Sequence, residues 1–391
     1  MMNKSLYVLL VVLFFCASPA VARKRTPVAV SRNYSSMVVN KDTTVSFCYC
    51  GAGKQVYVQT DMLFAGEDST HYNDLHTRKI KMERQSDGCF HATTRPVQQE
   101  TYTYCFRIGG KRKPDPLNKD TSWQMTHKWN IVSVGGTSQA DLYLPPKQEG
   151  RLLQTRWFDS NEQRYRRARI YLPAGYEQIV NGTCPNGKYP VIFLIHGFNG
   201  YEGSWMERGR AIQILENLVA RDSIQPFILV MPDCSTDKQE DHPVHHTLGN
   251  NLLHYSQLCR DHSLEFAWKD LMLHIDTTYR VSGYYAIAGL SSGARIAVNI
   301  ANRYPGMFQA VGLFSPVVYR EQMPSLDTLD MATEYYIYAG KNDFFLHSGR
   351  RFHKRLSKKG VPHSYTETIG GHTWRNWRLY LTDFLLQLHQ H

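Results

Sequence analysis

Beyond residue 22 the sequence lacks any apolar run long enough to cross a membrane, and it lacks internal repeats, low-complexity tracts and CxxC pairs with zinc spacing. These absences exclude membrane-spanning bundles, repeat arrays and zinc fingers. Lysine and arginine outnumber acidic residues by 45 to 34, yet no basic helix face and no nucleic-acid-binding motif is present. We therefore predict a solvated basic surface, no nucleic-acid partner and no stable membrane span.

The composition allows large cores, because 42% of the 391 residues are apolar. A chain of this length is long for one ordinary domain, so we expect two domains. Nothing in the sequence specifies the oligomeric state.

The N-terminal residues have the pattern of a secretory signal peptide. Lys4 precedes an apolar run over 6–16, and Ala20-Val21-Ala22 fits an A-x-A cleavage site. We predict that residues 1–22 are removed and that the mature chain is periplasmic or secreted. Lipid attachment at Cys16 is an alternative, which the bulky phenylalanine before this cysteine disfavours.

The mature chain would contain an odd number of cysteines, which implies at least one free thiol or an intermolecular bond. The seven cysteines are Cys48, Cys50, Cys89, Cys105, Cys184, Cys234 and Cys259. Their pairing cannot be read from the sequence. Cys48 and Cys50 lie two apart on an expected strand and share a face, and both pairing and simple burial remain open for them.

The N-terminal part of the mature chain has the pattern of β-structure. Residues 40–110 alternate between apolar and polar types, and Asp87-Gly88 is a hairpin-turn signal between two such runs. No convincing helix interrupts them. We predict an antiparallel β-sandwich domain over 23–140, followed by a linker over 141–152.

From 153 to 391, apolar runs typical of buried strands alternate with amphipathic segments. The expected strands are 168–172, 191–195, 227–231, 284–288, 308–314, 334–338 and 364–368. The expected helices are 210–221, 264–279, 292–304, 347–359 and 374–391. This alternation predicts an α/β domain with a doubly wound, mostly parallel sheet, whose ligands bind at the carboxyl ends of the strands.

The strongest chemical signal is Gly289-Leu290-Ser291-Ser292-Gly293, a G-x-S-x-G sequence between an expected strand and a helix of small residues. This context is typical of a nucleophile elbow, a sharp turn that needs neighbours without bulk. We predict that Ser291 is a catalytic nucleophile. A serine hydroxyl is weak by itself and requires a general base.

The base and its supporting acid are expected after later strands, in the order serine, acid, histidine. His372 follows the last expected strand in Gly370-Gly371-His372, and Asp343 follows the strand before it. We predict that Asp343 orients His372 and stabilises its imidazolium form. The rival acids, Asp327, Glu334 and Asp330, precede or begin that strand rather than follow it.

The turn after the strand 191–195 is a candidate oxyanion site. We assign the backbone N–H groups of Phe198 and Ser292 to the oxyanion hole. His196, Gly197, Trp205 and Trp374 are predicted to border the substrate.

The connection from Cys234 to Asp261 is unusually long, and we interpret it as a loop that covers substrate. It contains Asp241, His242, His245 and His246. A metal site there is conceivable from the residue types alone, but we expect neither a metal nor a cofactor.

The second half of the chain resembles the esterase-D-like α/β-hydrolases, a family of feruloyl, acetyl-xylan and enterochelin esterases and mycolyltransferases. The resemblance rests on 188–200, Ser204-Trp205, 289–293, 340–345 and 370–377. It implies a metal-free, two-step acyl-enzyme mechanism with Ser291 as nucleophile and His372 as base. The family often has Met and two glycines after the nucleophile; here Ser292-Gly293-Ala294 leaves the shape of the acyl pocket open.

The first domain resembles the early-set immunoglobulin-like domains that precede many such esterases. The similar segments are 87–90, 102–106 and 114–118. Those domains are related to glycogen-binding modules, so Trp123 and Trp129 are candidate carbohydrate platforms, although we expect them to pack against protein.

These features predict a serine esterase that removes feruloyl or acetyl groups from plant cell-wall polysaccharide, with a polysaccharide-linked or small-molecule ester as its partner. A siderophore esterase and an acyltransferase are alternative enzymes. A carbohydrate-binding protein with an inactive hydrolase fold is the alternative from another class.

Overall fold

The computed structural model describes residues 34–124, 127–176, 187–198, 200–234, 263–317, 329 and 331–388. The chain from Ser35 onward forms one unit by its internal contacts. The predicted signal peptide, Cys184, Cys259 and the histidines at 242, 245 and 246 lie outside the described residues. Among the helices described, none is long and apolar enough to cross a membrane.

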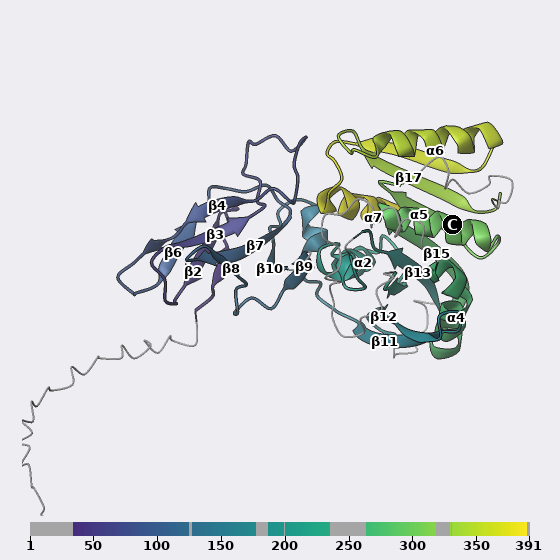
Figure 1. Ribbon diagram of the computed structural model, residues 1–391, viewed down its shortest axis with the longest axis horizontal. Coiled ribbons are helices and arrows are strands. Elements are labelled where there is room, and N and C mark those ends of the chain that lie inside the picture. The colour runs from purple at the N-terminus through teal and green to yellow at the C-terminus, as the bar shows by residue number, and fades with distance from the viewer. Residues whose placement is uncertain are drawn as a thin grey trace, which may run out of the picture. The chain divides into compact units, whose positions relative to one another are not determined.

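Two antiparallel sheets form the N-terminal part of the chain (Figure 1). One has the order β1-β2-β6-β5, with β1 Met37–Val39, β2 Val45–Tyr49, β6 Phe90–Thr93 and β5 Glu83–Arg84. The other has the order β4-β3-β7-β10-β9, with β4 Arg78–Lys81, β3 Val56–Thr60, β7 Thr101–Ile108, β10 His127–Ser133, β9 Thr121–Gln124, and β8 Lys111–Lys113 beside β7. The predicted antiparallel, strand-rich first part is confirmed.

The chain over 78–84 is divided between the two sheets. β4 pairs with β3 in one sheet, whereas β5 pairs with β6 in the other. Met82 lies at the break and is buried, and its N–H donates to the carbonyl of Val56. The chain changes sheets here because a strand that crosses a sandwich must leave one ladder before it joins the next.

An eight-stranded sheet forms the rest of the fold, in the order β11-β12-β14-β13-β15-β16-β17-β18. Its strands are β11 Arg151–Asp159, β12 Arg164–Leu172, β13 Tyr189–Ile195, β14 Ile228–Pro232, β15 Val281–Leu290, β16 Ala310–Phe314, β17 Glu334–Gly340 and β18 His363–Thr368. The strands from β14 to β18 in this order pair in parallel, and β11 and β12 pair antiparallel at one edge. The predicted mostly parallel sheet is confirmed.

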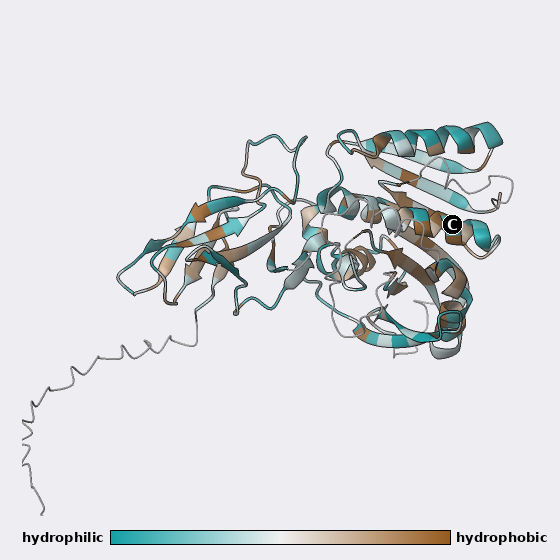
Figure 2. Cartoon of the chain, viewed as in Figure 1, coloured by the Kyte–Doolittle hydropathy of each residue, from teal (hydrophilic) through white to brown (hydrophobic). Residues whose placement is uncertain are grey.

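Helices cover both faces of this sheet. One core contains residues of α4 Ser263–Thr278, α5 Ser292–Arg303 and α6 Leu346–Lys359, and the other contains residues of α2 Ala211–Val219 and α7 Trp374–Leu388. The short helix α1 Ser204–Glu207 adds Trp205 to the second core. Figure 2 shows that the central strands are hydrophobic, as expected for strands buried on two faces.

The segment predicted as a linker is partly packed into the structure. The 3₁₀ helix η1, Ala140–Tyr143, buries Leu142 and Tyr143 in the core beside α2. The strand β11, which the sequence pattern did not predict, begins at Arg151. Its alternation was obscured because β11 is an edge strand with two exposed arginines, Arg151 and Arg156.

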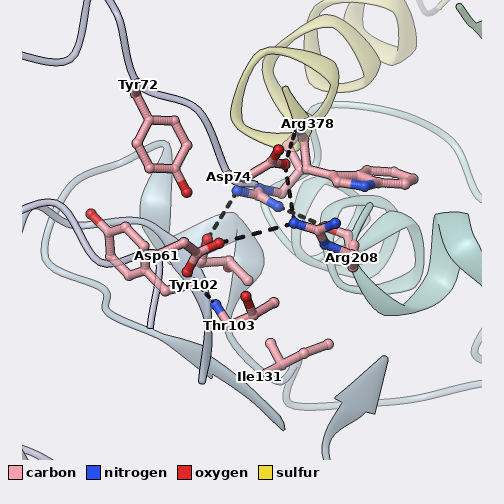
Figure 3. Close-up of a pocket in the computed structure, with 10 residues that line it drawn as sticks. Asp61, Tyr72, Asp74, Tyr102, Thr103, Ile131, Arg208 and Arg378 are labelled. Carbon is pink, nitrogen blue, oxygen red and sulfur yellow. Dashed lines mark hydrogen bonds and ion pairs between the residues drawn. The ribbon is translucent and has the colours of Figure 1, made fainter. Parts of the chain in front are cut away.

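A buried group of charged side chains joins the N-terminal sheets to the second part of the chain (Figure 3). Arg208, which follows α1, lies 3.1 Å from Asp74 and 4.0 Å from Asp61. Arg378 of α7 lies 3.0 Å from Glu100 and donates to the carbonyl of Thr101. Buried charges require such partners, because transfer out of water costs several kcal/mol for each ion.

Asp61 makes the stability of this contact dependent on pH. Burial raises the pKa of Asp61 to about 6, although Arg208 and the N–H of Thr103 oppose this rise. Because the folded chain holds the Asp61 proton more tightly than the unfolded chain does, the protonated acid favours folding. This contribution to the free energy of unfolding is complete below the unfolded pKa of 3.8 and is lost as pH rises through about 6. Between about pH 4 and pH 7, the free energy of unfolding of the neutral variant Asp61→Asn should therefore rise by roughly 2–3 kcal/mol relative to that of the wild type.

Urea unfolding of both chains at several pH values measures this difference. Asp222→Asn, which removes an exposed carboxylate, is the control and should not gain with pH. Equal pH slopes for wild type and Asp61→Asn would show that Asp61 is already ionised in the folded chain at acidic pH.

Candidate active site

Ser291 occupies a strained turn between β15 and α5. Its backbone has φ 56° and ψ −121°, a conformation that side-chain-bearing residues rarely adopt and that costs on the order of 1–3 kcal/mol. The flanking glycines permit the turn, because a Cβ at Gly289 would lie 2.3 Å from the carbonyl oxygen of Gly293, and a Cβ at Gly293 would lie 2.4 Å from that of His196. This is the geometry of a nucleophile elbow.

The structure brings Ser291, His372 and Asp343 together from three loops. His372 Nε2 lies 3.0 Å from Ser291 Oγ, and His372 Nδ1 lies 3.0 and 3.1 Å from the two oxygens of Asp343. The loops that carry the acid and the histidine are joined by the N–H of Asn342, which donates to the carbonyl of Gly370 at 2.9 Å. A hydroxyl, an imidazole and a carboxylate in this order can activate the hydroxyl for acyl transfer.

Asp343 is held in its charged form by hydrogen bonds. Burial acts to raise its pKa, but hydrogen bonds from His372 and Ser315, together with the charge of His372, outweigh burial and the net pKa is lowered. The side chain of Asp343 is fully buried, whereas that of His372 keeps a small exposed fraction. The carboxylate is therefore available to orient the imidazole at neutral pH.

Ser315 and Trp377 extend this arrangement, and no sequence pattern had indicated a role for Ser315. Ser315 follows β16, is fully buried and has a left-handed φ of 51°. Its hydroxyl bonds to Asp343 and accepts the indole N–H of Trp377 at 3.0 Å. Trp377 lies in the core, and its ring also packs edge-to-face on that of His372, with ring centroids 4.9 Å apart. The available signal was that Ser315 directly follows a strand at its carboxyl end.

Removing the Ser315 hydroxyl should shift the pH dependence of activity. Without it, burial meets less opposition, so the pKa of Asp343 rises and the charged form is lost at a higher pH. We expect Ser315→Ala to lower kcat about tenfold, the equivalent of one hydrogen bond of ~1.4 kcal/mol, and to move the acid limb of the pH–rate profile upward.

Steady-state kinetics over the acid range, on a chromogenic ester, measure both effects. Ser282→Ala, an exposed serine on β15, is the matched control. A fall in activity with an unshifted acid limb would assign Ser315 to packing alone.

The turn after β13 lies against the elbow. A Cβ at Gly197 would be 3.3 Å from the Cβ of Ser291, so the backbone approaches closely there. Phe198 is partly exposed, and Ser292 is the first residue of the 12-residue helix α5, whose N-terminus favours negative charge. The predicted oxyanion groups thus lie on two segments adjacent to Ser291.

Two residues predicted to border the substrate are buried instead. His196 is 4% exposed, and its Nε2 accepts the backbone N–H of Cys234 at 3.1 Å and lies 3.4 Å from Asp233. Trp205 is 1% exposed and donates to the carbonyl of Ile195 at 3.0 Å. We interpret both as supports for the turn after β13. Backbone N–H and C=O groups that are buried at strand ends need hydrogen-bond partners, and these two side chains provide them.

Two aromatic residues, Trp374 and Phe344, stand close in sequence to His372 and Asp343. Trp374 is half-buried and packs edge-to-face on Trp205 and Trp377, with ring centroids 5.5 and 5.2 Å apart. Phe344 is 71% exposed although its ring lies 4.4 Å from that of His372. An exposed aromatic ring beside the base offers an apolar surface to a substrate.

The N-terminal part of the chain reaches both loops of the site. Asn342 donates to the carbonyl of Thr70 at 2.8 Å, and the N–H of Trp374 donates to Asp74 at 3.1 Å. These contacts flank Asp343 and His372. The loop over 61–77 therefore supports the acid and histidine loops, which no local sequence pattern predicted.

Of the rival acids, Glu334 lies within the described residues, at the opposite end of its strand from Asp343. Glu334 begins β17 and accepts a hydrogen bond from Tyr336, on the side of the sheet away from the carboxyl ends. Asp327 and Asp330 lie outside the described residues, as does Asp241 of the long connection after Cys234.

Comparison with known proteins agrees with this geometry. A family described as "Putative esterase" matches residues 160–388, more than half of the chain. An endo-1,4-β-xylanase/feruloyl esterase of Xylanibacter ruminicola is 30% identical over 265 residues, which is 67% of this chain and 34% of that protein. The chain thus spans about a third of the length of this relative.

Solved structures share the fold at low identity. The enterobactin esterase of Shigella flexneri has a TM-score of 0.57 and 15% identity, over 89% of this chain and 93% of that one. A ferulic acid esterase of the anaerobic fungus Anaeromyces mucronatus has a TM-score of 0.52 and 20% identity, over 63% of this chain and 94% of that one. The predicted α/β-hydrolase fold is confirmed, and the chain belongs to the esterase family whose sequence pattern it matches over 160–388.

Proposed function

We propose that the chain is a serine carboxylic-ester hydrolase that removes feruloyl or acetyl groups from plant cell-wall polysaccharide such as xylan. The observation that carries the proposal is the hydrogen-bonded series of Ser291, His372 and Asp343 at a strained elbow. Membership of an esterase family supports the reaction class.

In the proposed mechanism, Ser291 Oγ attacks the ester carbonyl carbon while His372 Nε2 takes the hydroxyl proton. The carbonyl π electrons move to oxygen, and the N–H groups of Phe198 and Ser292 stabilise the oxyanion. Collapse of this intermediate breaks the bond to the sugar oxygen, which receives the proton from His372. Water then attacks the acyl-serine with the same base, releasing the acid and restoring Ser291.

The substrate class is supported by the relative from Xylanibacter ruminicola, whose description includes both xylanase and feruloyl esterase activities. Its alignment covers 67% of this chain. The exposed Phe344 beside His372 is compatible with an aromatic acyl group such as feruloyl, because aromatic rings prefer tilted or offset contacts with one another.

A siderophore esterase is the second candidate. The enterobactin esterase of Shigella flexneri aligns with 89% of this chain, whereas the fungal ferulic acid esterase aligns with 63%. The larger coverage extends into the N-terminal sheets, which contact the loops of Asp343 and His372 through Thr70 and Asp74.

A substrate panel distinguishes these candidates. We expect kcat/KM on methyl ferulate or acetylated xylan to exceed that on a catecholate siderophore ester by at least about 100-fold, a difference of ~2.7 kcal/mol in transition-state stabilisation. A preference for the catecholate would favour the siderophore esterase, and similar low activity on all three would contradict the polysaccharide proposal. Formation of a new ester in the presence of an added alcohol would identify an acyltransferase.

We also propose that the chain is exported after removal of residues 1–22. The support is the sequence pattern alone: Lys4, the apolar run and the A-x-A site. Intact mass of the mature chain tests it, with Arg23 expected at the N-terminus. A lipidated Cys16 at the N-terminus would instead show anchoring to a membrane.

A further inference from the structure

Four potential metal ligands gather on one face of the N-terminal sheet β1-β2-β6-β5, far in sequence from the catalytic residues. Cys48 of β2 pairs directly with His91 of β6 in the antiparallel ladder. Cys50 and Cys89 follow at the next positions on the same side, and a disulfide joins them. Because side chains alternate across a strand, positions 48, 50, 89 and 91 share one face, opposite the core residues of β2 and β6.

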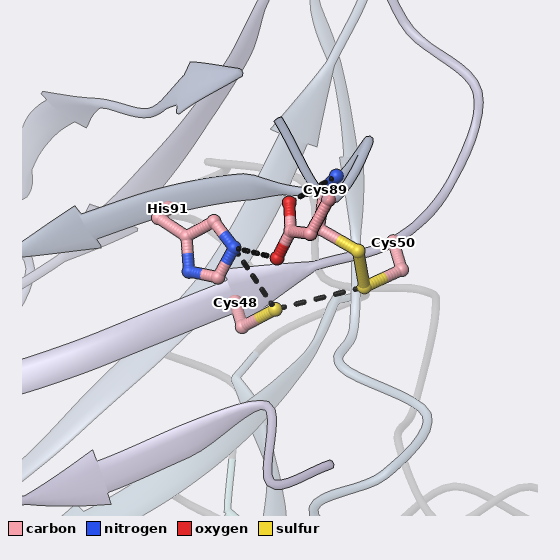
Figure 4. Close-up of a disulfide and its surroundings, with 5 residues drawn as sticks. Cys48, Cys50, Cys89 and His91 are labelled. Atoms are coloured by element: carbon pink, nitrogen blue, oxygen red, sulfur yellow. Dashed lines mark hydrogen bonds and ion pairs between the residues drawn. A yellow bond between two sulfur atoms is a disulfide. The ribbon is translucent and has the colours of Figure 1, made fainter. Parts of the chain in front are cut away.

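Two distances from the Cys48 sulfur approach those of a tetrahedral metal site. Zinc–sulfur bonds of ~2.3 Å and zinc–nitrogen bonds of ~2.0 Å at tetrahedral angles place sulfurs about 3.8 Å apart and sulfur and nitrogen about 3.5 Å apart. Cys48 Sγ lies 3.6 Å from Cys50 Sγ and 3.8 Å from His91 Nε2 (Figure 4). The three sulfur atoms all lie within 4.8 Å of one another.

The Cys50–Cys89 disulfide accounts for only two of the four side chains. Cys48 is a free cysteine, half-buried with its sulfur against the disulfide, and His91 points its ring nitrogen at the same sulfur (Figure 4). A disulfide that only joins two strands requires neither a third cysteine nor a histidine beside it. Three sulfurs within 4.8 Å of one another, with an imidazole nitrogen 3.8 Å from one of them, supply the residue types of a closed Cys₃His zinc site.

We propose that Cys48, Cys50, Cys89 and His91 bind a thiophilic divalent cation of the Zn²⁺ class when their cysteines are thiols. Binding of the cation releases the three thiol protons and leaves three thiolates and a neutral imidazole as ligands. His91 Nε2 now lies 2.8 Å from Asp87 Oδ2, and the metal replaces this contact. The disulfide and the metal exclude each other, because both require Cys50 and Cys89.

Cobalt titration of the full chain tests the proposal. The chain carries Cys184→Ser and Cys259→Ser, so that cysteines outside the described residues do not contribute, and is kept reduced with a phosphine, which takes an oxygen atom from water as the disulfide becomes two thiols. We expect one Co²⁺ per chain with thiolate charge-transfer bands and tetrahedral d–d bands, and displacement by Zn²⁺.

Two variants that spare the disulfide cysteines make the test specific. Cys48→Ser and His91→Ala should each weaken Zn²⁺ binding by about 100-fold or more in competition with a chromophoric chelator, because loss of a ligand exceeds loss of a supporting contact. Cys105→Ser, a free buried cysteine on β7, is the matched control and should bind as the parent does.

Two outcomes would overturn the metal site. The first is a reduced chain that shows no thiolate charge-transfer bands at stoichiometric Co²⁺. The second is equal Zn²⁺ affinity of the parent, Cys48→Ser and His91→Ala chains. Native mass spectrometry and far-UV circular dichroism on the same samples verify that each variant is folded. Metal binding is measured without ester hydrolysis, so a failure of the metal site would leave the proposed esterase function untouched.

Discussion

Replacing Ser291 with alanine should lower kcat for ester hydrolysis by about 10⁵- to 10⁶-fold, because removal of a serine nucleophile leaves only the contribution of binding and the oxyanion groups. The variant should fold, since the alanine keeps the Cβ and occupies the same turn. Its backbone remains at φ 56°, so the strain of the elbow is unchanged. Labelling by a fluorophosphonate probe measures the nucleophile directly and should be lost in this variant.

The control for this experiment is Ser282→Ala, on the same strand β15 but at its exposed end. It should label and hydrolyse as the wild type does. A Ser291→Ala chain that still reacts with the probe would show that the nucleophile is another residue. A wild-type chain that does not react would show that the protein is not a serine hydrolase.

Asp343→Asn should lower kcat by about 10⁴-fold with little change in stability. The amide has nearly the same shape as the carboxylate, but it offers an N–H group or a neutral oxygen to His372 Nδ1, which lies 3.0 Å away. The imidazole then loses the partner that fixes its tautomer and stabilises its positive charge. Burial of the acid, with no exposed area on its side chain, makes this contact difficult for water to replace.

Pre-steady-state kinetics measure the loss of kcat, and urea unfolding of the same preparation measures any change in stability. Asp222→Asn, on the surface and with φ 52°, tests whether an aspartate-to-asparagine change is harmful in general; asparagine tolerates this backbone conformation. If Asp343→Asn retained activity within about tenfold of wild type, another acid would have to support His372.

The contrast between His372 and His196 shows how far sequence position informs a role. Both follow a strand of the parallel sheet and both stand beside glycine. His372 reaches Ser291 and Asp343, whereas His196 is buried against Asp233 and Cys234. The difference depends on the direction in which each loop leaves the sheet, and that direction is set by packing against other segments.

The group of Cys48, Cys50, Cys89 and His91 also could not be predicted from sequence position alone. The sequence excluded CxxC spacing, but Cys48-Tyr49-Cys50 and Cys89-Phe90-His91 are two shorter motifs whose proximity depends on strand pairing. A register shifted by one residue would have turned one motif to the other face of the sheet. Pairing between residues about 40 apart is decided by the sandwich core.

The sequence by itself determined the alternation of strands and helices, the elbow at Ser291 and the order of serine, acid and histidine. These depend on local sterics and on hydrophobic period, which neighbouring residues encode. Only the tertiary structure decided that Ser315 and Trp377 support Asp343, and that the loop over 61–77 contacts both catalytic loops. Those contacts join residues far apart in the chain, and their formation depends on how whole sheets and helices pack, which no short window of sequence contains.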